Sequence, residues 1–184
     1  MESVLISDKT CWFAARTRCG AELGVRDRLD RFGTEHFLPV EHRRHTRSRA
    51  SYEHPLIPGL IFLHTTKKQA CALTNEMGLP VRYLIDPATH TLLVVPDKQL
   101  DDFRRVLDLS AEKGGLMDCP LALGDFVRVI KGPLRGVEGR VLELRGHIYV
   151  VVELLGCFFA RATVRRTWLE KIEVPRTDFG TNHS

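Results

Sequence analysis

The sequence predicts an α+β domain, in which helices flank an antiparallel sheet, followed by a small all-β barrel. Two observations support this division. Residues 12–107 alternate short apolar runs with segments whose apolar residues recur at helical spacing. From residue 126 onward, short β-branched and aromatic runs lie close together and no helical period remains, which is typical of a small barrel.

The first domain is expected to follow the order β-α-β-β-α-β-β-α. An opening strand is predicted at 12–17, where an aromatic pair is followed by small residues. Leu60 to Leu63 forms an apolar run after Pro58 and Gly59, and therefore predicts a buried strand introduced by a turn. The remaining strands are predicted at 37–40, 81–85 and 91–95.

Three helices are predicted between these strands. The first covers 21–32 and ends at Gly33, a typical stop signal. The second begins after Thr66, whose side-chain oxygen can cap the first turn. Its expected inner face carries Ala70, Leu73 and Met77, whereas the third helix opens at Asp97 with Leu100, Phe103 and Leu107 inward.

The stretch 110–120 is polar and contains two adjacent glycines, so it is predicted to be a linker. Beyond it, strands are predicted at 126–130, 140–144, 148–154, 158–162 and 169–172. The expected domains are therefore residues 1–109, the linker 110–120, a barrel at 121–174 and a flexible tail at 175–184.

Composition places the chain among ordinary globular proteins. The net charge of +4 and the pI of about 8.9 permit an anionic partner without requiring one. No apolar run approaches the roughly 20 residues that span a bilayer, and the first residues do not resemble a signal peptide. The five cysteines are scattered, which fits reduced thiols in the cytoplasm. A cytoplasmic monomer without a membrane partner is expected.

No arrangement of residues points to catalysis. His42, His45 and His54 lack the spacing of a tetrahedral metal site, and no nucleophile signature surrounds any cysteine. Gly132, Gly136 and Gly139 follow a strand but open no helix, so they do not form a nucleotide fingerprint. We therefore expect a protein that is not an enzyme and that holds no metal and no cofactor.

The segment GDFVRVIKGPLRGVEGRVLEL resembles the KOW motif of small barrels in transcription elongation factors and ribosomal proteins. Gly132 and Pro133 break the first strand and predict a turn. Gly136 and Gly139 precede the second strand, where glycine suits a bulge or a close backbone approach. The motif positions are Gly124, Gly132, Pro133, Gly136 and Gly139.

The order of motifs along the chain resembles the NusG family of transcription elongation factors. WFAARTRCGAE is followed by PLIPGLIFL, a linker and the KOW segment. GLPVRYLID and TLLVVPDKQLDDFRRVLD are similar to the specialised UpxY-type paralogues, which act as antiterminators on long surface-polysaccharide operons. The resemblance implies an NGN-like first domain that binds RNA polymerase at its clamp, an SH3-like KOW barrel, and suppression of pausing or termination.

Two other functions stay open. One is a housekeeping NusG factor that acts on all genes. The other is a ribosome-associated, RNA-binding KOW protein. Purification with polymerase rather than with ribosomes separates the second from the NusG-type functions.

The resemblance implies a clamp-docking segment at Leu56, Ile57, Pro58, Gly59 and Leu60. Leu60 stands where the general factor has an aromatic residue. From the residues alone, an apolar pair in a strand is more often core. The resemblance instead favours an exposed strand face with at least one of Ile57 and Leu60 at the interface.

An arginine-rich stretch precedes the docking segment. Planar guanidinium groups suit phosphates, and the stretch joins two predicted strands, so an extended hairpin tip is expected. A solvated loop is the alternative. The resemblance places this region near the non-template DNA strand, and leader RNA is a further candidate partner. The candidate nucleic-acid residues are Arg43, Arg44, Arg47 and Arg49, with Arg16 and Arg18 widening the patch.

A last candidate surface lies on the barrel. In the general factor, an aromatic residue of this region helps the barrel to dock on a small-subunit ribosomal protein. Leu155 stands in its place here. Phe158 and Phe159 follow closely and either shift this apolar surface or fill the core.

Overall fold

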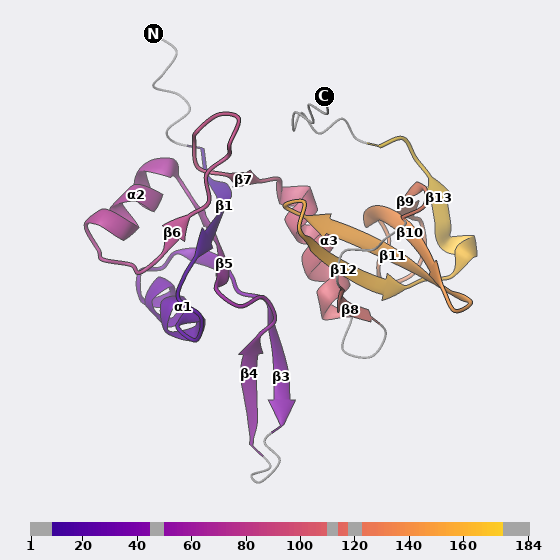
Figure 1. The fold of residues 1–184 in the computed structure, drawn as a ribbon, viewed down its shortest axis with the longest axis horizontal. Helices are drawn as coiled ribbons and strands as arrows, with labels where there is room; N and C mark the ends of the chain where they lie inside the picture. The colour runs from indigo at the N-terminus through magenta and orange to yellow at the C-terminus, as the bar shows by residue number, and fades with distance from the viewer. Residues whose placement is uncertain (1–8, 45–49, 110–113, 118–122, 175–184) are drawn as a thin grey trace. The chain divides into compact units, whose positions relative to one another are not determined.

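The computed structural model describes residues 9–44, 50–109, 114–117 and 123–174. The chain divides into two compact units, Met1–Asp97 and Lys98–Ser184 (Figure 1). The first unit is a mixed α/β fold and the second is rich in antiparallel strands, which confirms the predicted fold class. Among the described residues, no helix combines the length and the apolar character needed to cross a membrane.

The first unit is built on one antiparallel sheet. Its strand order is β2-β5-β1-β6, and β7 also pairs with β1. The central strands β1 and β5 pair over their whole length, from Cys11 opposite Thr65 to Arg16 opposite Leu60. The strands are β1 (Cys11–Arg16), β2 (Glu35–Phe37), β5 (Leu60–Thr65), β6 (Arg82–Tyr83) and β7 (Val94–Val95). The last two are shorter than predicted, since between them the chain forms only an isolated bridge, Ile85 with Leu92.

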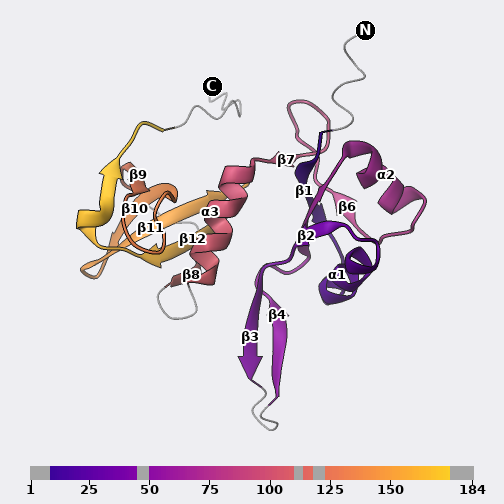
Figure 2. The same cartoon turned by 180° about the vertical axis from the view of Figure 1, so that it is seen from behind.

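Helices α1 (Glu22–Arg31) and α2 (Lys67–Asn75) pack on one face of this sheet (Figure 2). The predicted cap is confirmed, because the Thr66 hydroxyl oxygen accepts a hydrogen bond from the Gln69 N–H at 3.2 Å. The prediction that Met77 points inward is wrong: α2 ends before it, and its side chain is 43% exposed. The shared core contains Ala15, Val25, Leu29, Leu38, Ile61, Leu63, Leu73 and Leu79.

A separate two-stranded hairpin projects from the first unit (Figure 1). It is formed by β3 (Val40–Arg44) and β4 (Ser51–Pro55), as the arginine-rich stretch predicts. At its base, the Leu56 N–H donates to the Pro39 carbonyl at 2.8 Å. The residues between the two strands, 45–49, lie outside the described part of the chain.

The second unit holds a six-stranded antiparallel sheet in the order β13-β9-β10-β11-β12-β8. Every predicted barrel strand is present. Residues 114–117, inside the stretch expected to be a linker, instead form β8 and pair with β12, so this part of the stretch is structured. The strands are β8 (Gly114–Met117), β9 (Phe126–Val129), β10 (Glu138–Leu144), β11 (His147–Leu154), β12 (Phe158–Thr163) and β13 (Leu169–Lys171).

Gly139 shows why the KOW segment needs glycine in its second strand. A Cβ atom placed there would lie 2.3 Å from the Val151 carbonyl oxygen, far inside van der Waals contact. Because the obstacle is backbone, a side chain could be admitted only if the strands moved apart. The predicted close backbone approach is therefore confirmed.

Helix α3 (Asp97–Asp108) begins the second unit and is tied to the loop between β9 and β10. The Lys98 ammonium donates to the Gly136 carbonyl at 2.8 Å, and Arg105 donates to the Arg135 carbonyl at 2.7 Å. These cations satisfy carbonyls that the loop itself leaves unpaired. The predicted inward residues of α3, Leu100, Phe103 and Leu107, are all buried.

Asp102 completes this attachment from the same helix. Its side chain is only 3% exposed, and its Oδ2 atom accepts hydrogen bonds from the Glu138 N–H at 3.1 Å and from Lys98. Burial raises the pKa of Asp102 above its ordinary value of 3.8, although both donors act in the opposite direction. The contact therefore holds the barrel loop at an electrostatic cost.

The Asp102 carboxylate predicts a pH dependence of stability. Because its pKa is raised in the folded state, its contribution is fully present below the unfolded pKa and is lost as pH rises through the folded pKa. We expect Asp102→Asn to gain stability relative to the unmodified chain as pH rises above the ordinary carboxyl pKa of 3.8. Denaturant unfolding of both proteins over a series of pH values measures the difference, and a constant difference would contradict the prediction.

Candidate functional site

Ile57 to Leu60 form a tight turn, here called the Pro-Gly turn, between the hairpin and β5. The Leu60 N–H donates to the Ile57 carbonyl at 3.3 Å, and Gly59 has φ +72°. Proline second and a positive-φ glycine third are typical of a type II turn. A Cβ atom on Gly59 would lie 3.0 Å from the Thr17 carbonyl oxygen, so both conformation and space favour glycine.

A buried carboxylate holds the Pro-Gly turn in place. Glu22 at the start of α1 is 2% exposed, and its Oε1 atom accepts a hydrogen bond from the Gly59 N–H at 2.7 Å. The Thr17 N–H donates to the Gly59 carbonyl at 3.0 Å, so both polar groups of this glycine are bound. Sequence reasoning missed Glu22. An available signal was an acid in the first turn of a helix whose preceding residue, Ala21, cannot cap it with a side chain.

The expected exposed strand face is not present at this turn. Ile57 is 5% exposed and Leu60 is 2% exposed. Leu60 opens a strand that lies between β2 and β1 in the sheet, so it is enclosed by neighbours on both sides. The expectation that either side chain is free for docking is therefore wrong. Of the docking segment, Pro58 is exposed, Leu56 is half-buried and Gly59 is buried.

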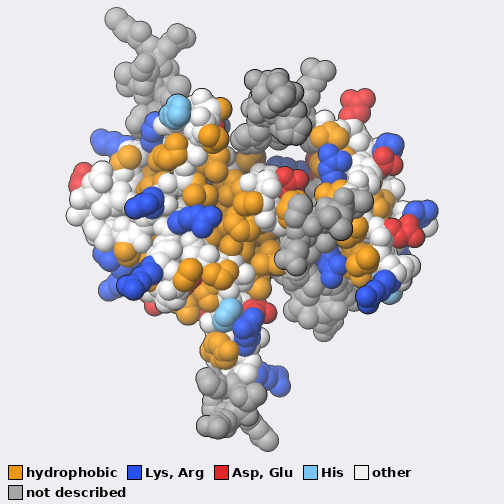
Figure 3. All heavy atoms as spheres, in the orientation of Figure 1, with side chains coloured by type: hydrophobic (Ala, Val, Ile, Leu, Met, Phe, Trp, Pro, Cys, Tyr) orange, Lys and Arg blue, Asp and Glu red, His pale blue; other side chains and the backbone are white. Residues whose placement is uncertain are grey.

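The hairpin presents its described arginines on opposite faces. Arg43 lies opposite Tyr52, and Arg44 lies opposite Ser51. Because side chains alternate along a strand, these adjacent arginines point to opposite sides of the ribbon. Figure 3 shows basic side chains on this projecting hairpin. The structure thus forms a thin ribbon with a cation on each side rather than one flat patch.

The two arginines differ in their local charge. Arg43 forms an ion pair with Glu41 on its own strand, and its Nε atom donates to Glu41 Oε1 at 2.5 Å. Arg44 forms no ion pair with any described residue. Arg47 and Arg49, the other two predicted phosphate contacts, lie outside the described residues. Sequence reasoning also missed Tyr52, an aromatic side chain that is 43% exposed beside Arg43.

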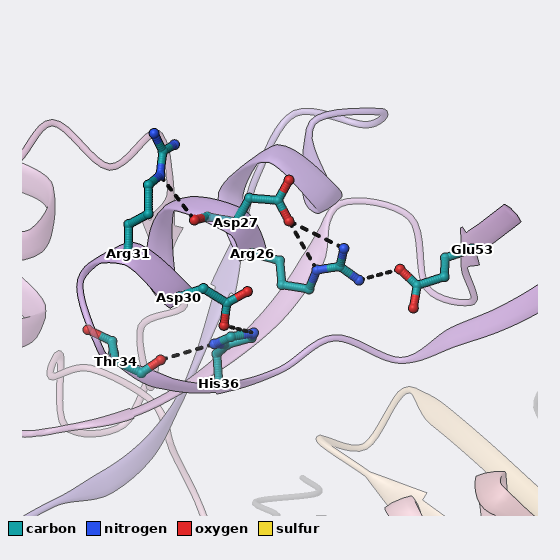
Figure 4. A network of polar contacts seen from close by, with 7 residues as sticks. All are labelled: Arg26, Asp27, Asp30, Arg31, Thr34, His36 and Glu53. Atoms are coloured by element: carbon teal, nitrogen blue, oxygen red, sulfur yellow. Dashed lines mark hydrogen bonds and ion pairs between the residues drawn. The ribbon is translucent and has the colours of Figure 1, made fainter.

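An ion pair connects the hairpin to helix α1. Arg26 binds Glu53 of β4 directly, and its Nε and Nη2 atoms also donate to Asp27 Oδ1 at 3.3 Å each (Figure 4). The Glu53 carboxylate raises the pKa of Arg26. Both partners of the Arg26–Glu53 pair are more buried than a free surface pair, with side chains 27% and 33% exposed. The orientation of β4 is therefore set from α1.

Arg16 and Arg18 lie near the Pro-Gly turn. Both side chains are exposed, and they flank Thr17, whose N–H binds the Gly59 carbonyl. The structure therefore brings these two arginines to the docking segment.

The barrel candidates are divided between surface and core. Leu155 sits in the turn between β11 and β12 with φ +55°, and both Leu155 and Phe158 are half-buried. Phe159 is 7% exposed and pairs with Glu153 across the strands. Of the KOW positions, Gly132, Pro133 and Gly136 lie in the loop between β9 and β10.

Within the described residues, no three histidine, cysteine or acidic side chains gather as a metal site would require.

Comparisons with known proteins bear on the first part of the chain. Residues 10–104 match the family model described as "Transcription termination factor nusG". One solved structure, titled "Domain interaction in Thermotoga maritima NusG", is 20% identical, with 90% of this chain and 98% of that chain covered and a TM-score of 0.49. A search of curated proteins gave no match.

Removal of the buried Glu22 carboxylate is expected to destabilise the fold. Glu22→Ala leaves the Gly59 N–H without a partner, which should lower the free energy of unfolding by about 1–3 kcal/mol. Glu22→Gln keeps an acceptor oxygen and should lose less. Urea unfolding of the full chain measures both variants, and equal losses would show that the acceptor bond is not what stabilises the turn.

The hairpin predicts an asymmetry between its charged residues. Glu41→Gln frees Arg43 and should tighten binding of a short single-stranded DNA, whereas Arg44→Ala should weaken it. Each lost phosphate contact should reduce the slope of log K against log salt by about 0.7. Fluorescence anisotropy at several salt concentrations measures this, with Arg31→Ala on α1 as a charge-matched control. An unchanged slope for Arg44→Ala would assign the hairpin to a solvated role.

Proposed function

Because this chain belongs to the NusG family of transcription factors, we propose that it is an operon-specific antitermination factor. Factors of this family bind RNA polymerase and act in elongation or termination, without catalysing a reaction. The proposed protein suppresses pausing or termination after it has joined the transcribing enzyme. Surface-polysaccharide operons are the proposed targets, since the motifs after the Pro-Gly turn are similar to the UpxY type.

The observation that carries this proposal is the fixed relation between the Pro-Gly turn and the hairpin. Glu22 binds the turn, and Arg26, four residues later on α1, binds the hairpin strand β4. Residues four apart lie on the same helix face. One helix thus positions an apolar turn for polymerase and a basic ribbon for DNA, which is what a factor that bridges the two requires.

The docking contact is proposed for the accessible part of the segment. Pro58 is exposed and Leu56 is half-buried, whereas Ile57 and Leu60 form the support beneath them. Arg16 and Arg18 stand beside the turn and supply positive charge at the rim of the contact. Rim charges mainly steer association, and buried apolar groups supply affinity.

The mechanism is a shift of populations. A factor that binds both polymerase and the DNA it holds favours the polymerase conformation in which both contacts are made. It changes pausing only by the difference between its affinities for the running and the paused enzyme. The hairpin arginines are proposed to contact the non-template strand through its phosphates, without reading bases.

Operon specificity is proposed because two residues differ from the pattern of the general factor. Leu60 and Leu155 stand where the resemblance places aromatic residues of the general factor. A housekeeping factor is the second candidate, favoured by the match of residues 10–104 to the general family model. A ribosome-associated KOW protein is the third, and it would purify with ribosomes rather than with polymerase.

Sequencing of nascent transcripts tests the proposal. Deletion of the gene should shorten transcripts of one operon or a few, and the unmodified chain should restore them. Leu56→Glu should fail to restore them because a charge at the docking contact must be desolvated. Ile57→Glu is not an equivalent test, since its buried side chain predicts loss of the fold.

In this experiment, circular dichroism must show that Leu56→Glu folds. A change across all transcripts would instead identify a housekeeping factor.

The barrel predicts weak coupling to the ribosome. Because Leu155 replaces the aromatic residue of the general factor, binding to the small-subunit ribosomal protein should be roughly thirtyfold weaker than that of a general factor. This is the usual effect of removing one aromatic anchor from an interface. Calorimetric titration of both full-length proteins measures this, and Leu155→Phe should recover part of the loss. Equal affinities would mean that Phe158 has taken over the contact.

A further inference from the structure

One face of the barrel combines aromatic rings and arginines outside the sites described above. Tyr149 and His147 lie on β11, and Arg161 lies on β12. In the register of these strands, Tyr149 is opposite Thr163 and Val151 is opposite Arg161. Tyr149 and Arg161 therefore share one face of the sheet. On the opposite face Val150 and Ala162 are buried, and on the shared face Val151 is buried as well. The shared face is therefore accessible only towards the strand end that carries His147 and Tyr149.

The three side chains contact one another around the Tyr149 ring and are here called the Tyr149 platform. The Arg161 guanidinium carbon lies 4.9 Å from the centre of the Tyr149 ring. The His147 ring meets the same tyrosine at 6.4 Å, with 60° between the ring planes. His147 is exposed and the other two are partly exposed. The platform is thus ordered by its own contacts and still open to a ligand.

A second arginine–aromatic pair lies at the same end of these strands. The Arg165 guanidinium is 5.2 Å from the centre of the Trp168 ring. Val164, the residue before Arg165, donates its N–H to the Ile148 carbonyl at 2.9 Å, between the two platform residues of β11. Trp168 is seated on the backbone of Gly132, where a Cβ atom would approach the ring to 2.4 Å.

The arginines of this end are poorly neutralised. Arg145, Arg161 and Arg165 form no ion pair with any described residue. Two of the barrel's carboxylates pair with other cations, Glu143 with Arg166 at 3.2 Å and Asp125 with Lys171 at 2.8 Å. Partly exposed rings beside guanidinium groups without an ion pair suit single-stranded nucleic acid, in which bases stack on rings and phosphates bind arginine.

We propose that the Tyr149 platform, with Arg145 and Arg165, is a binding surface for single-stranded RNA. The choice of RNA rests on the proposed function, because the nascent transcript is the single strand that a polymerase-bound factor meets besides non-template DNA. The tyrosine hydroxyl and the histidine ring also offer polar groups to a 2′-hydroxyl, the group that distinguishes RNA from DNA. The barrel then holds the transcript while the hairpin contacts DNA.

Binding of a fluorescein-labelled single-stranded RNA of mixed sequence tests this surface. The full chain is used in the Arg43→Ala, Arg44→Ala, Arg47→Ala and Arg49→Ala background, which removes the candidate DNA contacts. Tyr149→Ala should weaken binding about fivefold or more, the usual range for one stacked base, and Tyr149→Phe should retain most of it. Arg161→Gln should also reduce the slope against log salt by about 0.7.

Lys171→Gln is the matched control, since it removes one positive charge from another strand of the same barrel. Melting curves confirm that each variant folds. RNA affinity that is unchanged by both Tyr149→Ala and Arg161→Gln would overturn the proposal, as would equal affinity for DNA of the same sequence. Neither result would affect the nascent-transcript test of the proposed function, so the two proposals can fail separately.

Discussion

The hydrogen bond from the Gly59 N–H to the Glu22 carboxylate is the contact on which the first unit's candidate surface depends. It joins the start of α1 to the turn between the hairpin and the central strand β5. A charged acceptor in a buried site forms a strong bond, and the same site makes its loss expensive. The Thr17 N–H fixes the other side of the glycine from the end of β1. Three segments distant in sequence therefore define one turn.

The same helix controls the hairpin. Arg26 lies one helical turn after Glu22 and pairs with Glu53 on β4. A two-stranded ribbon alone is only marginally stable in water, so its direction relies on such anchors and on the Leu56–Pro39 bond at its base. This arrangement explains how a long basic ribbon keeps a defined position relative to the Pro-Gly turn. Within the ribbon itself, Glu41 neutralises Arg43, one of its two described arginines.

In the second unit, the contacts with helix α3 and the Tyr149 platform lie at different positions along β11. At one end, Gln99 of α3 donates to the Glu153 carbonyl at 2.9 Å, and Asp102 and Lys98 hold the neighbouring loop. The Tyr149 platform begins four residues earlier on the same strand. The contacts of helix α3 with β11 are therefore made away from the platform, and burial of Asp102, which raises its pKa, is the electrostatic cost of this support.

The sequence by itself determined most of the secondary structure and the fold class, because apolar periodicity, caps and turn glycines are local signals. The helix cap at Thr66 and the close backbone approach at Gly139 were predicted from such signals. It did not determine the boundary between the units, since α3 was expected in the first domain and begins the second unit. Tertiary structure decided the rest. Ile57 and Leu60 are buried because β5 is central in its sheet, a position that depends on pairing with β1 and β2. Glu22 and the Tyr149 platform are functional candidates only because folding brings distant residues into contact, and residue spacing along the chain carries no record of those distances.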